Sequence, residues 1–177
     1  MLATFAPLTF LGNHDVTRLA SQLRDERHLA HALVILLTVG GIPSIYAGDE
    51  HAFRGVKEHR AGGDDAIRPA FPDRPDQLAT PQWPHYRLHQ FLIGFRRRHP
   101  WLVRARTTVT TLTSTAIVYT VSDGSASLAV ALNIADQPAE LTLPTGGWQR
   151  AAGTAKVSSH HVSLPASAWA ILTNAET

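Results

Sequence analysis

The sequence predicts an α/β segment followed by an all-β domain. Near the start, an apolar run, a polar loop, a long helical segment and a second apolar run follow one another. A second helical pattern ends at Pro100, and from about Thr107 the chain changes to short β-prone runs. The 177 residues, 44% hydrophobic and 17% charged, are enough to bury a core. We expect two domains, residues 1–104 and 105–177.

The first strand and helix follow from residue type and length. Residues 3–11 are apolar and threonine-rich and stop at Gly12–Asp15, which predicts a buried strand at about Leu8–Leu11 and a polar loop after it. Residues 28–37 form a segment too long and too rich in leucine and alanine for a strand. We predict a helix there, ended by the glycine pair at 40–41.

A second strand is predicted at Ile42–Tyr46, where Pro43 is tolerated because it stands at the beginning. The strand ends at the polar stretch Ala47–Glu50. Strand, helix and strand within about 35 residues have the size of one βαβ unit with parallel strands. Polar residues therefore follow the ends of both strands.

The next segment, Phe53–Pro84, is rich in glycine and proline and has no periodicity. A loop of that length in a compact fold is usually functional or ordered by a partner. Helical spacing returns at His85–Arg98 and stops at Pro100. The residues predicted on one face of this helix are Leu88, Phe91, Leu92 and Phe95.

The remainder of the chain predicts an antiparallel β domain, a small sandwich. Turns are expected at Asp123-Gly124 and Gly146-Gly147. The β-prone runs are Thr107–Leu112, Ala116–Val121, Leu128–Asn133, Leu141–Leu143 and Trp169–Thr173.

Composition excludes several classes of protein. The chain has no cysteine, so disulfide scaffolds and cysteine-based metal sites or nucleophiles are excluded. Its formal net charge is +2, and its arginines are not interleaved with aromatic residues, so we expect no nucleic-acid partner. No apolar run reaches the length of about 18 residues that crosses a membrane, and we expect no membrane partner. Residues 1–10 do not resemble a signal peptide. The location stays open: a cytoplasmic protein is favoured, and secretion is the alternative if an export signal precedes Met1.

Two motifs at the strand ends carry the chemistry. The stretch Phe10–Asp15, then a helix, then Gly41–Glu50, resembles the α-amylase family, glycoside hydrolase family thirteen, at strands seven and eight of its barrel. The resemblance continues through Leu88–Leu102, which is similar to the last barrel helix, and more loosely through the β domain. It implies the last β/α units of a TIM (β/α)8 barrel followed by an antiparallel β-sandwich domain. In such a barrel the active site lies at the carboxyl ends of the strands.

The resemblance assigns roles to two adjacent residues. Asp15 matches the third catalytic carboxylate, which would hold the distorted sugar and stabilise positive charge at the anomeric carbon. His14 matches the histidine that hydrogen-bonds hydroxyls of the same sugar. Without the resemblance, Asp15 is more typical of a helix N-cap than of a catalytic residue. The alternative for His14 is a loop histidine with only local bonds.

Asp64 and Arg68 resemble the family's Asp-x-x-x-Arg pair, which contacts a sugar further along the non-reducing side. A plain surface salt bridge is the alternative. Asp65 leaves the register open by one residue.

Other polar residues are expected to be structural. Asn13 would shape the first loop, and Asp49 and Glu50 would orient the rim of the barrel. His28 and His31 stand at helical spacing, but no third ligand is evident and a half-exposed helix face is expected. We expect no metal site and no cofactor in this chain, while a calcium site in the missing part of the parent protein stays open.

A retaining glycosidase needs two carboxyl groups about 5 Å apart, a nucleophile and a general acid. The family takes both from strands four and five, which this sequence does not match. We therefore expect a segment of a retaining α-glucan-active hydrolase or transglycosylase, acting on starch or malto-oligosaccharides and inactive alone. Its partners would be that substrate and the missing N-terminal barrel segment. A non-catalytic amylase-like interaction or carbohydrate-binding protein is the alternative.

Overall fold

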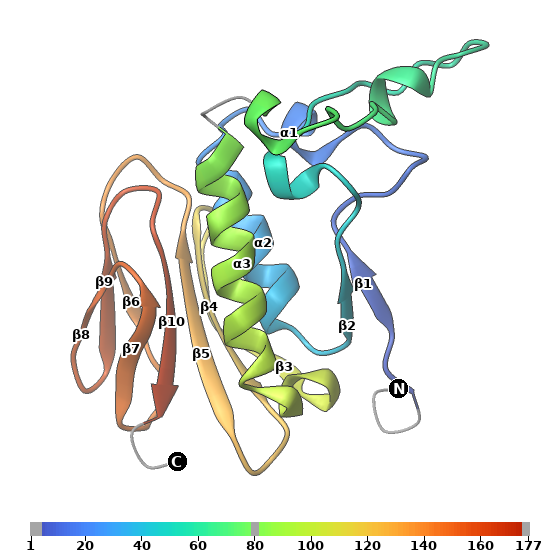
Figure 1. The fold of residues 1–177 in the computed structure, drawn as a ribbon. Helices are drawn as coiled ribbons and strands as arrows, with labels where there is room; N and C mark the ends of the chain where they lie inside the picture. The colour runs from blue at the N-terminus through green and yellow to red at the C-terminus, as the bar shows by residue number, and fades with distance from the viewer. Residues whose placement is uncertain (1–4, 79–81, 175–177) are drawn as a thin grey trace. The chain divides into compact units, whose positions relative to one another are not determined.

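The structure is a computed structural model that describes residues 5–78 and 82–174 (Figure 1). The chain divides into two compact units. A helical unit comprises residues 8–37 and 43–98, and a β unit is formed chiefly by residues 99–174. The predicted boundary between residues 104 and 105 stays a prediction.

The predicted strand–helix–strand order is confirmed. Strands β1 (Leu8–Phe10) and β2 (Ile42–Ser44) form a two-stranded sheet, and helix α2 (His28–Thr38) lies between them in sequence. The two arrows run in the same direction, as a βαβ unit requires (Figure 1). Both strands are shorter than predicted. A single helical turn that the sequence did not predict, α1 (Leu19–Gln22), follows the polar loop after β1.

Helix α2 is buried around most of its circumference. Leu33, Val34, Leu36 and Leu37 are all buried. His31 is only 3% exposed, and its ring meets the ring of His28 edge to face at 5.5 Å. The prediction of a half-exposed histidine face is therefore wrong for His31, because this side of the helix is covered as well.

The second predicted helix is confirmed as α3 (Trp83–Arg97), with Pro84 in its first turn, where proline is tolerated. Leu92 and Phe95 are buried, whereas Phe91 is 45% exposed. The prediction that Phe91 shares the face of Leu92 and Phe95 is wrong, because the buried stripe of this helix is narrower than the spacing suggests and Phe91 lies at its edge.

The long loop before α3 has local order of its own. Among its described residues, 3₁₀ helices stand at Asp65–Ile67 and Pro75–Gln77, and another precedes the loop at Asp49–His51. The side chain of Ile67 is fully buried and anchors the middle of the loop. Among the residues that the structure describes, no helix has the length and hydropathy needed to cross a membrane.

The β unit consists of two antiparallel sheets. The larger sheet has the order β3-β4-β5-β10-β7, and its strands are β3 (Arg106–Leu112), β4 (Ala116–Ser122), β5 (Ser127–Asn133), β10 (Trp169–Asn174) and β7 (Trp148–Gly153). The smaller sheet has the order β6-β9-β8, with β6 (Ala139–Thr142), β9 (His161–Leu164) and β8 (Lys156–Val157). The five β-prone runs of the sequence are confirmed as strands, and β7, β8 and β9 were not predicted.

One core joins the two sheets. Val118 and Ala131 of the larger sheet and Val162 and Leu164 of the smaller sheet are fully buried in the same apolar cluster. Because both sheets turn alternate side chains into one interior, the β unit is a sandwich, as predicted.

Candidate functional site

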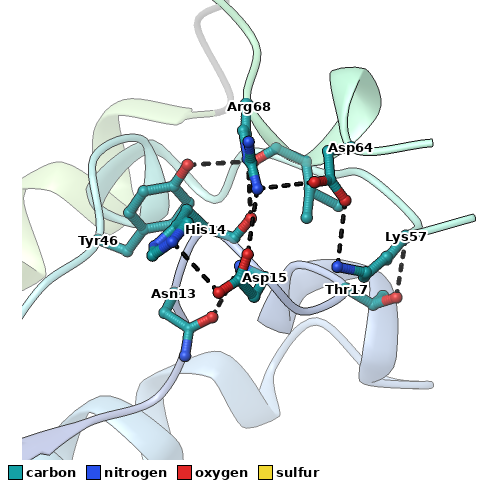
Figure 2. A network of polar contacts seen from close by, with 9 residues as sticks. Asn13, His14, Asp15, Thr17, Tyr46, Lys57, Asp64 and Arg68 are labelled. Carbon is teal, nitrogen blue, oxygen red and sulfur yellow. Dashed lines mark hydrogen bonds and ion pairs between the residues drawn. The ribbon is translucent and has the colours of Figure 1, made fainter. Parts of the chain in front are cut away.

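The four residues that the sequence singled out lie together in one network, called here the Asp15 cluster: His14, Asp15, Asp64 and Arg68. Arg68 Nη2 lies 3.1 Å from Asp15 Oδ1 and 2.7 Å from Asp64 Oδ2. His14 Nε2 lies 3.2 Å from Asp15 Oδ2. Figure 2 shows the network from close by. It joins the polar loop after β1 to a segment more than 50 residues later in the chain.

The loop after β1 presents the Asp15 carboxylate outward. The backbone N–H of Asp15 donates to Asn13 Oδ1 at 2.8 Å, a local turn in which the Asn13 amide shapes the loop as expected. The N-cap interpretation of Asp15 is wrong, because α1 begins at Leu19 and its N-cap position is Arg18. The carboxylate is therefore not used by a helix, and it is 58% exposed.

Arg68 connects the two halves of the cluster. Its Nε donates to the His14 carbonyl oxygen at 2.9 Å, while Nη2 contacts both carboxylates. The ion pair joins Arg68 to Asp64, and Asp65 begins a 3₁₀ helix. The match of Asp64 and Arg68 to the family's pair stays a prediction.

Lys57 keeps the Asp64 carboxyl group ionised. Its Nζ lies 3.1 Å from Asp64 Oδ1, and its backbone N–H donates to Thr17 Oγ1 at 3.0 Å. The hydrogen bond from Lys57, together with the positive charges of Arg68 and Lys57, lowers the pKa of the Asp64 carboxyl below its ordinary value. Asp64 is therefore an ionised acceptor at neutral pH.

The cluster is open to solvent and suits hydroxyl groups. The side chains of His14, Asp15, Asp64 and Arg68 are between 36% and 63% exposed. Carboxylates accept hydrogen bonds and a guanidinium donates several in one plane, so the cluster offers both partners that a hydroxyl needs. A sugar carries many such hydroxyls.

Sequence reasoning missed Arg18, which is only 2% exposed. Its Nε donates to the Ile67 carbonyl at 2.8 Å, and its Nη1 donates to the Ala47 carbonyl at 2.8 Å and to Asp49 Oδ1 at 3.0 Å. The guanidinium also lies 4.1 Å from the ring centre of Tyr46. One buried side chain thus ties together the loop after β1, the loop after β2 and the segment that leads to Arg68.

No sequence signal distinguishes Arg18 from an ordinary surface arginine. Its partners stand 29, 31 and 49 positions away, so its burial depends on the tertiary fold.

The carboxylates of Asp49 and Glu50 both accept hydrogen bonds, Asp49 from the loop after β1 and Glu50 within its own loop. Asp49 accepts from Arg18, and burial raises the pKa of the Asp49 carboxyl although Arg18 opposes this. Glu50 Oε2 accepts from the N–H of Gly48 at 2.9 Å. Gly48 has a φ of 95°, and a Cβ there would lie 2.4 Å from the Phe53 ring, so this turn requires glycine.

Within residues 5–78 and 82–174, no three histidine or acidic side chains are grouped so that they would hold a metal ion. The expectations about cofactors stay predictions.

Comparison with known families adds independent information. Residues 3–116 match the family model of the alpha amylase catalytic domain, and residues 104–172 match a model described as a domain of unknown function, DUF3459. The cyclomaltodextrin glucanotransferase of Bacillus sp. (strain 38-2) is 29% identical over 152 residues, which are 82% of this chain and 20% of that protein. The chain therefore spans about a fifth of the length of this curated relative.

Solved structures agree with the predicted fold. An alpha-amylase from H. orenii superimposes with a TM-score of 0.79 at 20% identity, over 96% of this chain and 40% of that chain. A debranching enzyme of Nostoc punctiforme, soaked with acarbose, superimposes with a TM-score of 0.73 at 25% identity, over 94% and 33% of the two chains. The fold class is thus confirmed as the last β/α units of a TIM barrel followed by an antiparallel β-sandwich domain. The chain belongs to the α-amylase family, and it matches the family's catalytic domain over more than half of its own length.

Proposed function

We propose that this chain is part of a retaining hydrolase or transglycosylase that acts on α-glucosidic bonds of starch or malto-oligosaccharides. In this proposal Asp15 stabilises the transition state, and His14, Asp64 and Arg68 bind sugar hydroxyls. The observation that carries the proposal is the network of Asp15 and Arg68, because it gathers every candidate residue in one exposed cluster. The names of the relatives, a cyclomaltodextrin glucanotransferase and a debranching enzyme, support an α-glucan as the substrate.

The cluster holds the Asp15 carboxylate in place before a sugar arrives. Arg68 contacts one carboxylate oxygen and His14 the other, so rotation of the group is restricted. A fixed negative charge stabilises positive charge that develops at an anomeric carbon without first having to reorient. The remaining lone pairs of both oxygens accept hydrogen bonds from ring hydroxyls.

Arg68 and Asp64 extend the same surface toward a further sugar. The guanidinium has five N–H donors in a plane, and not all are used by the two carboxylates. Asp64, kept ionised by Lys57, accepts hydroxyl protons beside it. Such a pair recognises adjacent donor and acceptor groups on one ring.

Cleavage of the bond would need further groups. A nucleophile and a general acid have to flank the scissile bond about 5 Å apart. In the Asp15 cluster the Asp15 carboxylate is bound by Arg68 and the Asp64 carboxylate by Lys57, so we do not assign either role to them. We assign the nucleophile and the acid to other segments of the longer protein. This chain would then bind and polarise the sugar without cleaving it.

Titration of the ¹⁵N-labelled chain with maltotriose, followed by amide signals, tests the proposal. We expect saturable shifts of the amides of His14, Asp15 and Arg68, and loss of these shifts in Arg68→Ala. The matched control is Arg74→Ala, an exposed arginine outside the cluster. Absence of any response at His14, Asp15 and Arg68 in a folded sample would refute sugar binding by the cluster.

A further inference from the structure

Asp64 lies in a loop, residues 55–67, whose second half leads directly into Arg68. The two halves touch at the base of the loop, because a Cβ added to Gly55 would lie 2.0 Å from the backbone of the second half. Further out they are joined again, since Lys57 Nζ lies 3.1 Å from Asp64 Oδ1. The positions of Asp64 and Arg68 therefore depend on the contacts that hold both halves of this loop.

Arg18 binds both halves of the loop at its base. Its backbone N–H donates to the Gly55 carbonyl at 2.9 Å, and its side-chain Nε donates to the Ile67 carbonyl at 2.8 Å. The side chain is buried, and its Nη1 donates to Asp49 Oδ1 at 3.0 Å, which fixes the guanidinium. Because Ile67 immediately precedes Arg68, the Arg18 guanidinium holds the backbone from which the Arg68 side chain extends.

Two hydroxyl groups bind the first half of the loop. The backbone N–H of Lys57 donates to Thr17 Oγ1 at 3.0 Å, and that of Gly55 donates to Ser21 Oγ at 2.9 Å. Figure 2 shows Lys57 in contact with both Thr17 and Asp64. The Thr17 hydroxyl thus holds the backbone of Lys57, and the Lys57 ammonium group in turn holds the Asp64 carboxylate.

These hydrogen bonds hold the loop before any ligand arrives. A sugar that contacts Asp15, Asp64 and Arg68 together requires the three side chains at fixed separations. A displacement of about 1 Å in such groups can lower a reaction rate by about a hundredfold. Supporting hydrogen bonds that limit such displacements are therefore part of a working site.

We propose that Arg18 and Thr17 are positioning residues of the Asp15 cluster, because they hold the 55–67 loop so that Asp64 and Arg68 face the other cluster members. They act through the loop and not by contact with the sugar. The identity of the ligand rests on the proposed function, whereas the positioning of Asp64 and Arg68 does not.

The titration of Asp64 reports on this positioning without any ligand. The hydrogen bond from Lys57 and the positive charges of Arg68 and Lys57 lower the pKa of the Asp64 carboxyl, so this pKa rises if the cations move away. We expect a rise toward the ordinary value in Thr17→Val, which removes the hydroxyl that accepts from the Lys57 backbone. Thr17→Ser keeps that hydroxyl and should retain the lowered pKa. The ¹³C signal of the Asp64 carboxyl group, followed against pH, measures it.

Arg18→Lys tests the base of the loop. A lysine keeps a positive charge for Asp49, but it lacks the fork of donors that reaches Asp49 and the Ile67 carbonyl together. The second half of the loop should move, and the pKa of the Asp64 carboxyl should rise. The matched control is Arg24→Lys at an exposed position, which should leave this pKa unchanged. If Arg18→Lys does not fold, the Thr17 variants decide.

The maltotriose titration of the same variants supplies the functional readout. We expect the affinity to fall by about tenfold in Arg18→Lys and by about threefold in Thr17→Val, while Thr17→Ser and Arg24→Lys match the unchanged chain. A loss of global stability alone would change neither the affinity nor the Asp64 pKa of a chain that is still folded.

An unchanged Asp64 pKa, or an unchanged maltotriose affinity, in both Arg18→Lys and Thr17→Val would overturn the positioning role. If the Asp64 pKa rises in these variants but maltotriose shifts no amide of the unchanged chain, the proposed function fails and the positioning of the loop stands.

Discussion

The guanidinium of Arg68 lies 3.1 Å from the carboxylate of Asp15, although the two residues stand 53 positions apart. This contact joins the loop after β1 to the segment that carries Asp64. Because Arg68 also bonds to the His14 carbonyl, one side chain sets the positions of all the other cluster members. The proposed sugar-binding surface would therefore depend on the shape of this guanidinium.

Arg68→Lys should weaken maltotriose binding by about tenfold, as measured by calorimetry. A lysine ammonium keeps the charge, but it lacks the planar set of donors that reaches Asp15, Asp64 and the His14 carbonyl together. Arg74→Lys is the control, since Arg74 is exposed and lies outside the cluster. Equal affinity in Arg68→Lys would show that only the charge matters.

Arg18→Met should lower the free energy of unfolding by about 3–5 kcal/mol, as measured by urea denaturation. The change leaves the Asp49 carboxylate, 15% exposed, and the carbonyls of Ala47 and Ile67 without their donor. Removal of one partner of a buried ion pair is costly because the other charge stays buried. Arg24→Met, at an exposed position, should stay within about 0.5 kcal/mol of the unchanged chain. A similarly small effect of Arg18→Met would contradict its role as an anchor.

Stability should fall as the pH is lowered from about 7.5 to about 5. Burial lowers the pKa of His89 below its ordinary 6.5, against the opposing effects of Glu50 and Asp49. The unfolded chain therefore takes up a proton at a higher pH than the folded chain, and the stability contributed by neutral His89 is lost as the pH falls below 6.5 toward the folded-state pKa.

In His89→Gln this pH dependence should be smaller, because glutamine does not titrate and still donates to the His85 carbonyl that His89 Nδ1 contacts. Urea denaturation at the two pH values measures the difference, with the exposed His59→Gln as control. Identical pH dependence in His89→Gln and the unchanged chain would show that His89 does not contribute.

Elements with strong local patterns were predictable from sequence. Periodicity and length placed α2 and α3, and β-prone runs placed the five strands that carry most of the sandwich core. Strand β8 has two residues, which are too few for a pattern to stand out. Strands β7 and β9 were missed although they are as long as the predicted strands β10 and β6, so length does not explain them. The exposure of Phe91 and the burial of His31 depend on neighbours in space and were predicted wrongly.

The candidate site was predictable where a sequence motif marks its residues. His14, Asp15, Asp64 and Arg68 were found through motifs, and the structure places them together. Arg18 could not be found, because its partners come from segments distant in sequence.

The 177-residue chain alone should release no reducing sugar from starch or maltotriose. In the proposed function it supplies a polarising carboxylate and sugar-binding groups, and the nucleophile and acid belong to other segments. A colorimetric assay for reducing sugar measures this. Turnover that disappeared in Asp15→Ala would contradict the division of roles.

The central claim is that Asp15 stabilises the transition state of a glycosidase, and turnover by the full-length protein tests it most directly. Asp15→Asn preserves the shape of the side chain and removes its negative charge. Turnover of maltotriose should fall by about a hundredfold or more, because the lost charge acts on the developing positive charge at the anomeric carbon. The melting temperature should change little, since Asp15 is 58% exposed. Unchanged turnover in Asp15→Asn would contradict a role of Asp15 in stabilising the transition state.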